Sequence, residues 1–148
     1  MMTKTAQEQV LDTIREMYDC GIFSHLMDLC QGEFRTLYYL NCNINREIIP
    51  SMISTALNVS RGRTTATLTL LREKGYITME ISPADRRRML VKLTDMGITY
   101  TLNKQRQAER YVNYIVDFLG EENSSKLINL FKLITNKTKL MENMRHEN

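Results

Sequence analysis

Two short helical stretches joined by a turn constrain this chain more than any other feature. Residues 50–57 (PSMISTAL) begin with a proline, which suits the first position of a helix because the N–H it lacks would have no partner there. Asn58 and Val59 predict a short turn, and Ser60 predicts the N-cap of a second helix that stops at Gly75. Two short helices joined in this way are typical of a helix-turn-helix.

The hydrophobic period changes after this second helix. Ile77, Met79 and Ile81 alternate with polar residues, which is the period of a half-buried strand. A second β run covers residues 89–93 (MLVKL), and the charged loop PADRRR separates the two runs. The sequence therefore predicts a β-hairpin with a long basic tip.

Helices are predicted on both sides of this segment, because two prolines and six glycines in 148 residues leave few breaks. The predicted helices cover about residues 5–18, 33–40, 95–119 and 124–141. We expect Gly21 to end the first of them, Thr94 to cap the third and Gly120 to break the chain between the last two. The expected fold is mainly α, with a small β-hairpin.

Positive charge is concentrated in the central segment. Residues 60–92 carry a net charge of +5, although the whole chain carries only +3. The eight basic residues are Arg61, Arg63, Arg72, Lys74, Arg86, Arg87, Arg88 and Lys92, and the three acidic residues are Glu73, Glu80 and Asp85. This concentration on one helix and one hairpin predicts a nucleic-acid contact surface, with a merely solvated basic face as the alternative.

The start of the second helix has the chemistry to read DNA. A helix of about 10–12 Å diameter fits the major groove, which is about 12 Å wide. We expect its N-terminal residues to face the DNA, namely Ser60, Arg61, Gly62, Arg63 and Thr65. Arginine can bind guanine through two hydrogen bonds, and threonine can donate, accept or touch a thymine methyl. Leu68 and Leu71 are expected to face the core.

The hairpin tip is expected to enter the minor groove. Arg86, Arg87 and Arg88 follow Asp85 there, and an extended arginine senses the width and negative potential of that groove. An acid among three arginines is unusual at a DNA contact. We expect Asp85 to hold an arginine by a charge-assisted hydrogen bond and so to fix the loop, the alternative being a flexible loop with an unpaired acid.

These residues resemble the MarR family of winged helix-turn-helix regulators. The resemblance runs through LNVSRGRTTATLTLLREKGYI and ISPADRRRMLVKLTDMG, and its D-x-R wing signature falls on Asp85 and Arg87. It implies that residues 60–74 form the recognition helix and that Arg87 is the minor-groove residue. Ala66 stands where family members often carry arginine, so base reading is expected to rest on Arg61 and Arg63.

The resemblance also implies the organisation of the whole chain as one domain, residues 1–148. Residues 30–94 would form the winged helix-turn-helix DNA-binding lobe, and residues 1–29 and 95–148 a helical dimerisation region. A homodimer would place two recognition helices in successive major grooves about 34–36 Å apart, so we expect a pseudo-palindromic operator on double-stranded DNA. Repression is expected rather than activation.

Regulators of this kind commonly respond to small phenolic or aromatic compounds, to oxidants or to metals. The resemblance implies an effector pocket between the DNA-binding lobe and the dimerisation region. The candidate lining residues form an apolar and aromatic set with polar phenol tips, namely Tyr18, Phe23, Met27, Phe34 and Tyr38. The alternative is that these five are ordinary core residues.

Cysteine chemistry is a second candidate for sensing. Cys20, Cys30 and Cys42 are expected to be reduced thiols. No lysine or arginine lies in residues 17–31 to favour a reactive thiolate at Cys20, so a small buried apolar residue is expected there, with a thiol-based redox sensor as the alternative.

Other functions find less support. Cys20, His25, Asp28 and Cys30 have no standard zinc spacing, so neither a metal site nor a cofactor is expected. The sequence contains no H-E-x-x-H, no phosphate-binding glycine loop and no nucleophile elbow, and we expect no enzyme. Without a signal or membrane segment the expected location is the cytoplasm. A winged-helix module that binds protein is the alternative to a DNA-binding regulator.

Overall fold

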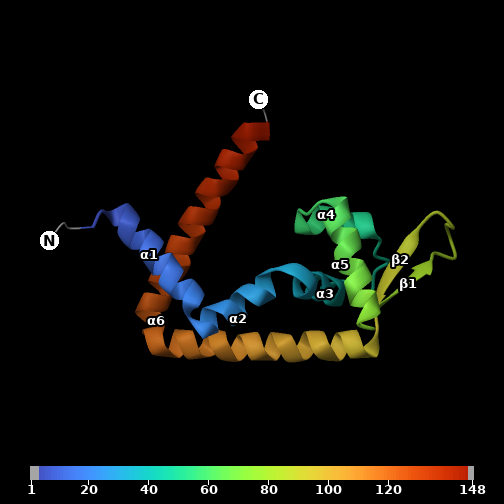
Figure 1. The fold of residues 1–148 in the computed structure, drawn as a ribbon, viewed down its shortest axis with the longest axis horizontal. Helices are drawn as coiled ribbons and strands as arrows, with labels where there is room; N and C mark the ends of the chain where they lie inside the picture. Colours follow the sequence, from blue (N-terminus) through green and yellow to red (C-terminus); the bar gives the residue numbers. More distant parts are fainter. Residues whose placement is uncertain (1–3, 147–148) are drawn as a thin grey trace. The chain divides into compact units, whose positions relative to one another are not determined.

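The computed structural model describes residues 4–146, apart from the side chains of Ile22, His25 and residues 139–146. Its elements are α1 (Ala6–Asp19), α2 (Gly21–Cys30), α3 (Gly32–Cys42), α4 (Pro50–Leu57), α5 (Arg61–Glu73), β1 (Ile77–Ile81), β2 (Met89–Leu93) and α6 (Asp95–His146) (Figure 1). The mainly α fold with one hairpin is therefore confirmed. The chain divides into two compact units, Met1–Ala108 and Glu109–Asn148, and the description below concerns the first unless stated otherwise.

The N-terminal helices differ from the prediction at Gly21. This glycine does not end α1 but begins α2, because Cys20 has extended backbone (φ −73°, ψ 121°) and closes α1 itself. The Cys20 N–H donates to the carbonyls of Glu16 and Met17, and its own carbonyl accepts from the N–H of Ser24. A single extended residue thus ends one helix and starts the next.

The helix-turn-helix has the predicted boundaries. Asn58 takes the left-handed conformation (φ 51°, ψ 51°) that ends α4, and the Ser60 side chain accepts a hydrogen bond from the N–H of Arg63 to cap α5. The next turn ends at Gly75, whose φ of +75° suits a residue without a Cβ. Local signals in the sequence therefore determine where both helices begin and end.

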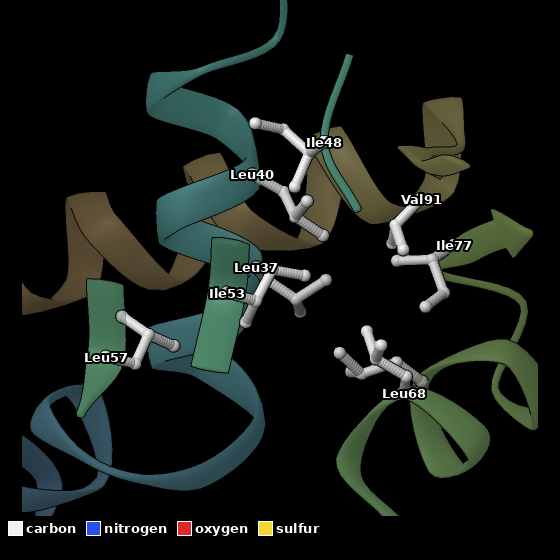
Figure 2. Packing of buried hydrophobic residues seen from close by; sticks show 9 residues of the cluster. Leu37, Leu40, Ile48, Ile53, Leu57, Leu68, Ile77 and Val91 are labelled. Atoms are coloured by element: carbon white, nitrogen blue, oxygen red, sulfur yellow. The ribbon is translucent and has the colours of Figure 1, made fainter. Parts of the chain in front are cut away.

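One hydrophobic core joins α3, α4, α5 and the hairpin (Figure 2). Its buried members are Leu37, Leu40, Ile48, Ile53, Leu57, Leu68, Leu71, Ile77 and Val91. Leu68 and Leu71 are almost fully buried, as expected, so one face of α5 is anchored and the opposite face is left in solvent. The core thereby determines which residues of α5 can meet a partner.

The hairpin is attached to this core at its base. Its strands pair antiparallel from Ile77 opposite Leu93 to Ile81 opposite Met89, and the N–H of Val91 donates to the carbonyl of Ile48 at 2.8 Å. Ile77 is buried whereas Ile81 is 61% exposed. The sheet therefore leaves the core toward its tip.

The start of α6 is held against the hairpin by Thr94. Its hydroxyl donates to the carbonyl of Gly75 at 2.7 Å and accepts from the N–H of Gly97 at 3.0 Å. Gly97 packs so closely on the carbonyl of Tyr76 that any side chain would collide with it.

Further along α6, Gly120 (φ 73°, ψ 171°) interrupts the helix as predicted. None of the helices in residues 4–146 has the length and apolar character needed to cross a membrane.

Candidate nucleic-acid interface

The first turn of α5 presents its polar residues to solvent. Arg61, Gly62, Arg63 and Thr65 are exposed, and an added Cβ at Gly62 would meet open space. The Thr65 hydroxyl donates to the carbonyl of Arg61 at 3.0 Å, so its hydrogen is already engaged. Thr65 can therefore offer a DNA base its methyl group or an oxygen lone pair, but not a free donor.

The tip of the hairpin is an ordered turn built around Asp85. One carboxylate oxygen accepts a hydrogen bond from the N–H of Arg87 at 3.0 Å, and the other lies 3.3 Å from Nε of Arg88. The carbonyl of Asp85 accepts from the N–H of Arg88, whose own carbonyl accepts from the N–H of Ser82. Asp85 thus holds an arginine as expected, and the structure identifies that arginine as Arg88.

Pairing divides the basic residues of the central segment into two groups. Three of them meet an acid: Lys74 bonds Glu33, Lys92 bonds Glu80 and Arg88 bonds Asp85. The hydrogen bond to Glu33 raises the pKa of Lys74 above its usual value. Within the described part of the chain the remaining five form no ion pair, namely Arg61, Arg63, Arg72, Arg86 and Arg87.

Four of these five unpaired arginines lie at the start of α5 or at the hairpin tip. Both places are exposed. Among the described residues, no acid forms an ion pair with Arg61 or Arg63 on α5, or with Arg86 or Arg87 at the hairpin tip. Unpaired arginines keep all of their hydrogen-bond donors available for phosphates and base edges. The structure therefore retains free positive charge at the two positions where the sequence predicts DNA contacts.

The structure also brings a residue to α5 that the sequence pattern did not indicate. Arg35 of α3 and Arg63 of α5 line the same cavity, which has a volume of about 360 Å³. Periodicity along one helix cannot reveal this relationship, because the two arginines belong to elements separated by α4. The only signal in the sequence is a basic residue within the predicted helix 33–40.

The five effector-pocket candidates are spread over three helices. Tyr18 on α1 is 68% exposed and Tyr38 on α3 is 44% exposed, so neither is an ordinary core residue. Phe23 and Met27 on α2 are half-buried, as is Phe34, whose ring stacks on Tyr38 with 6.2 Å between the centroids. Whether these side chains bind an effector stays a prediction.

The cysteines differ from the expectation. Cys20, Cys30 and Cys42 are free thiols, and all three are exposed. A buried apolar role for Cys20 is wrong, because this residue lies at the extended junction between α1 and α2 rather than on a packed helix face. Among the described residues no three metal-ligating side chains cluster, and the side chain of His25 lies outside that description.

Comparison with known proteins finds one matching family model and several similar solved structures. Residues 29–88 match the model of the MarR family, whereas a search of curated protein sequences finds no match. Among solved structures, the chain is similar to MepR, a transcription regulator of the Staphylococcus aureus multidrug efflux pump MepA. The identity is 20%, the TM-score is 0.67, and 90% of this chain and 98% of that chain are covered.

Several of the similar structures contain DNA. Streptococcus pneumoniae FabT in complex with DNA has 23% identity and a TM-score of 0.69, with 93% of this chain and 99% of that chain covered. The transcriptional repressor CouR bound to a 23-mer DNA duplex has 22% identity and a TM-score of 0.67, with 91% and 99% covered. MepR is a transcription regulator, CouR is a transcriptional repressor and FabT is in complex with DNA, and at these identities the likeness shows the fold of this chain.

Proposed function

We propose that residues 29–88, which match the MarR family model, form a winged helix-turn-helix lobe that binds DNA, and that the chain is a transcription regulator that acts as a homodimer. The observation that carries the proposal is the set of unpaired arginines at the start of α5 and at the hairpin tip. Arg61 and Arg63 would contact base edges in the major groove, and Arg87 would enter the minor groove. Ser60, Gly62, Thr65 and Arg86 complete the proposed contact surface around them.

A homodimer is supported by apolar side chains that a single chain leaves in water. Val10, Leu11 and Ile14 on α1 are each more than half exposed. In the second unit the same holds for Leu130, Phe131, Leu133 and Ile134 of α6. Exposed apolar stripes of this size mark protein–protein contacts, and a second copy of the chain supplies matching stripes.

The proposed regulator represses transcription in the cytoplasm and releases DNA when it binds a small aromatic effector. Its pocket would be lined by Tyr18, Phe23, Met27, Phe34 and Tyr38, and the stacked pair on α3 is the best-defined part of this set. A panel of phenols and aromatic carboxylates, titrated into the protein–DNA complex, tests this part. Release of DNA that Phe34→Ala abolishes supports the pocket, and release that Phe34→Ala leaves unchanged places the effector elsewhere.

Selection of bound sequences from a random duplex pool, with elution at rising salt, tests the DNA-binding proposal directly. Recovery of a pseudo-palindrome with half-sites about 10 bp apart supports a dimeric, sequence-specific regulator. Binding without an enriched motif and with a steep salt dependence would reduce the function to phosphate contacts. If no duplex is retained, the proposal fails and a protein-binding winged-helix module takes its place.

A further inference from the structure

We infer that Arg35, at the start of α3, holds a phosphate of the DNA backbone beside the groove that α5 enters. This inference rests on the proposed function and extends the contact surface to an element outside the helix-turn-helix and the hairpin. It arises from the cavity of about 360 Å³ between the start of α3 and the start of α5.

The walls of this cavity come from two parts of the lobe. Gln31, Gly32 and Arg35 line it from the α3 side, and Asn58, Arg63 and Thr67 line it from the helix-turn-helix side. All of these residues are described by the structure, and none of the described residues that line the cavity is acidic. The cavity therefore combines two guanidinium groups with polar groups and with no negative charge.

The nearest acid on α3 is already engaged. Glu33 accepts two hydrogen bonds from Nζ of Lys74, at 2.6 and 2.9 Å, and does not line the cavity. Arg35 is exposed and forms no ion pair within the described residues. Its guanidinium therefore has its donors free for an oxyanion.

The backbone at the start of α3 adds to this preference for an anion. Gln31 provides no side-chain cap, so the first N–H groups of α3 lack the partner that a serine or aspartate would supply. Gly32 has a φ of +60°, and an added Cβ there would meet open space, so no side chain obstructs the approach. These N–H groups would reinforce the charge of Arg35, since helix N-termini favour negative groups.

A DNA phosphate is the occupant that the position of the cavity favours. Arg63 belongs both to the cavity and to the exposed first turn of α5, which is the part of the lobe proposed to enter the major groove. We therefore expect a duplex seated on that turn to place a backbone phosphate of the flanking strand beside the cavity. Phosphate contacts of this kind fix the register of a protein on the duplex without reading its sequence.

Substitution of Arg35 tests the inference in the full-length protein. Arg35→Gln is expected to lower affinity about tenfold for selected and random duplexes alike, and to reduce the slope of log affinity against log salt by about one. Arg106→Gln on α6 removes the same charge from an exposed position outside the cavity and should leave both quantities unchanged. Equal affinity and an equal slope for Arg35→Gln and the native protein would overturn the inference.

Cys30 offers a second readout, because it is exposed and lines the same cavity. Bound duplex is expected to slow alkylation of Cys30 by N-ethylmaleimide, with Cys20 and Cys42 as internal references in the same mass spectrum. Protection of Cys30 by inorganic phosphate alone, combined with no effect of Arg35→Gln on DNA affinity, would instead assign the cavity to a free anion.

The inference and the proposed function can fail separately. Loss of DNA affinity in Arg87→Ala but not in Arg35→Gln would refute only the inference about Arg35. Failure of the native protein to bind any duplex would refute the proposed function as well.

Discussion

The carboxylate of Asp85 accepts a hydrogen bond from the backbone N–H of Arg87 at 3.0 Å, while the guanidinium of Arg87 forms no ion pair with any side chain that the structure describes. The acid thus fixes the main chain of the residue proposed to enter the minor groove without occupying its side chain. Its charge is directed to Arg88 instead. The hairpin tip therefore separates one arginine that organises the loop from one that is free to bind DNA.

Asp85→Ala is expected to weaken binding to a selected duplex about three- to tenfold, because the tip loses both of its carboxylate contacts. Asp85→Asn should retain most of the affinity, since an amide oxygen can still accept from the N–H of Arg87. Fluorescence anisotropy titrations of the two variants provide the comparison. Both substitutions remove one negative charge, so tighter binding by both would mean that net charge outweighs the geometry of the loop.

Arg87→Ala is expected to weaken binding broadly across sequences, by about tenfold, and to lower the salt slope by about one. The reason is that this guanidinium is free of ion pairs and would be drawn to the negative potential of the minor groove. A gel-shift titration at three salt concentrations measures both effects, with Arg106→Ala as the charge-matched control. Unchanged affinity would refute the assignment of the hairpin as a DNA-contacting wing.

Arg63→Ala should change the preference among duplexes rather than only the overall affinity. A lost pair of hydrogen bonds to guanine costs about 1–3 kcal/mol on the matching sequence and much less on random DNA. Competition between the selected duplex and a variant at each position measures this difference. Equal losses on both kinds of DNA would assign Arg63 to the phosphate side of the cavity that it shares with Arg35.

Leu68→Ala is expected to lower the free energy of unfolding by about 2–5 kcal/mol, because this side chain is 1% exposed in the centre of the core. Leu70→Ala, on the same helix but 46% exposed, should change it by about 0.5 kcal/mol or less. Urea denaturation at one fixed protein concentration gives both values, since dimerisation makes stability depend on concentration. Similar losses for the two variants would show that Leu70 is buried in the assembled protein.

Much of the lobe that contains the helix-turn-helix and the hairpin could be predicted from short stretches of sequence. Pro50, Ser60 and Gly75 each carry their signal in their own covalent structure, as a missing N–H, a capping oxygen and a missing Cβ. Alternating apolar residues predicted the first strand and a short apolar run predicted the second, and the family match over residues 29–88 overlaps this segment. Prediction is weaker before residue 30, where Gly21 predicts a helix end although the break lies at Cys20.

Local sequence signals are sufficient to predict the secondary structure of residues 50–93 and the segment in which basic residues concentrate. The ion pairs of these basic residues depend instead on how the chain folds: Lys74 is paired with Glu33 from α3, and the Asp85 carboxylate is paired with the guanidinium of Arg88 rather than that of Arg87. The fold also brings Arg35 and Arg63 to one cavity, and it packs Gly97 so closely on Tyr76 that no side chain fits there. Caps, turns and periodicity are predictable because they depend on residues close together in the sequence, whereas ion pairs and cavities depend on which distant elements the core brings together.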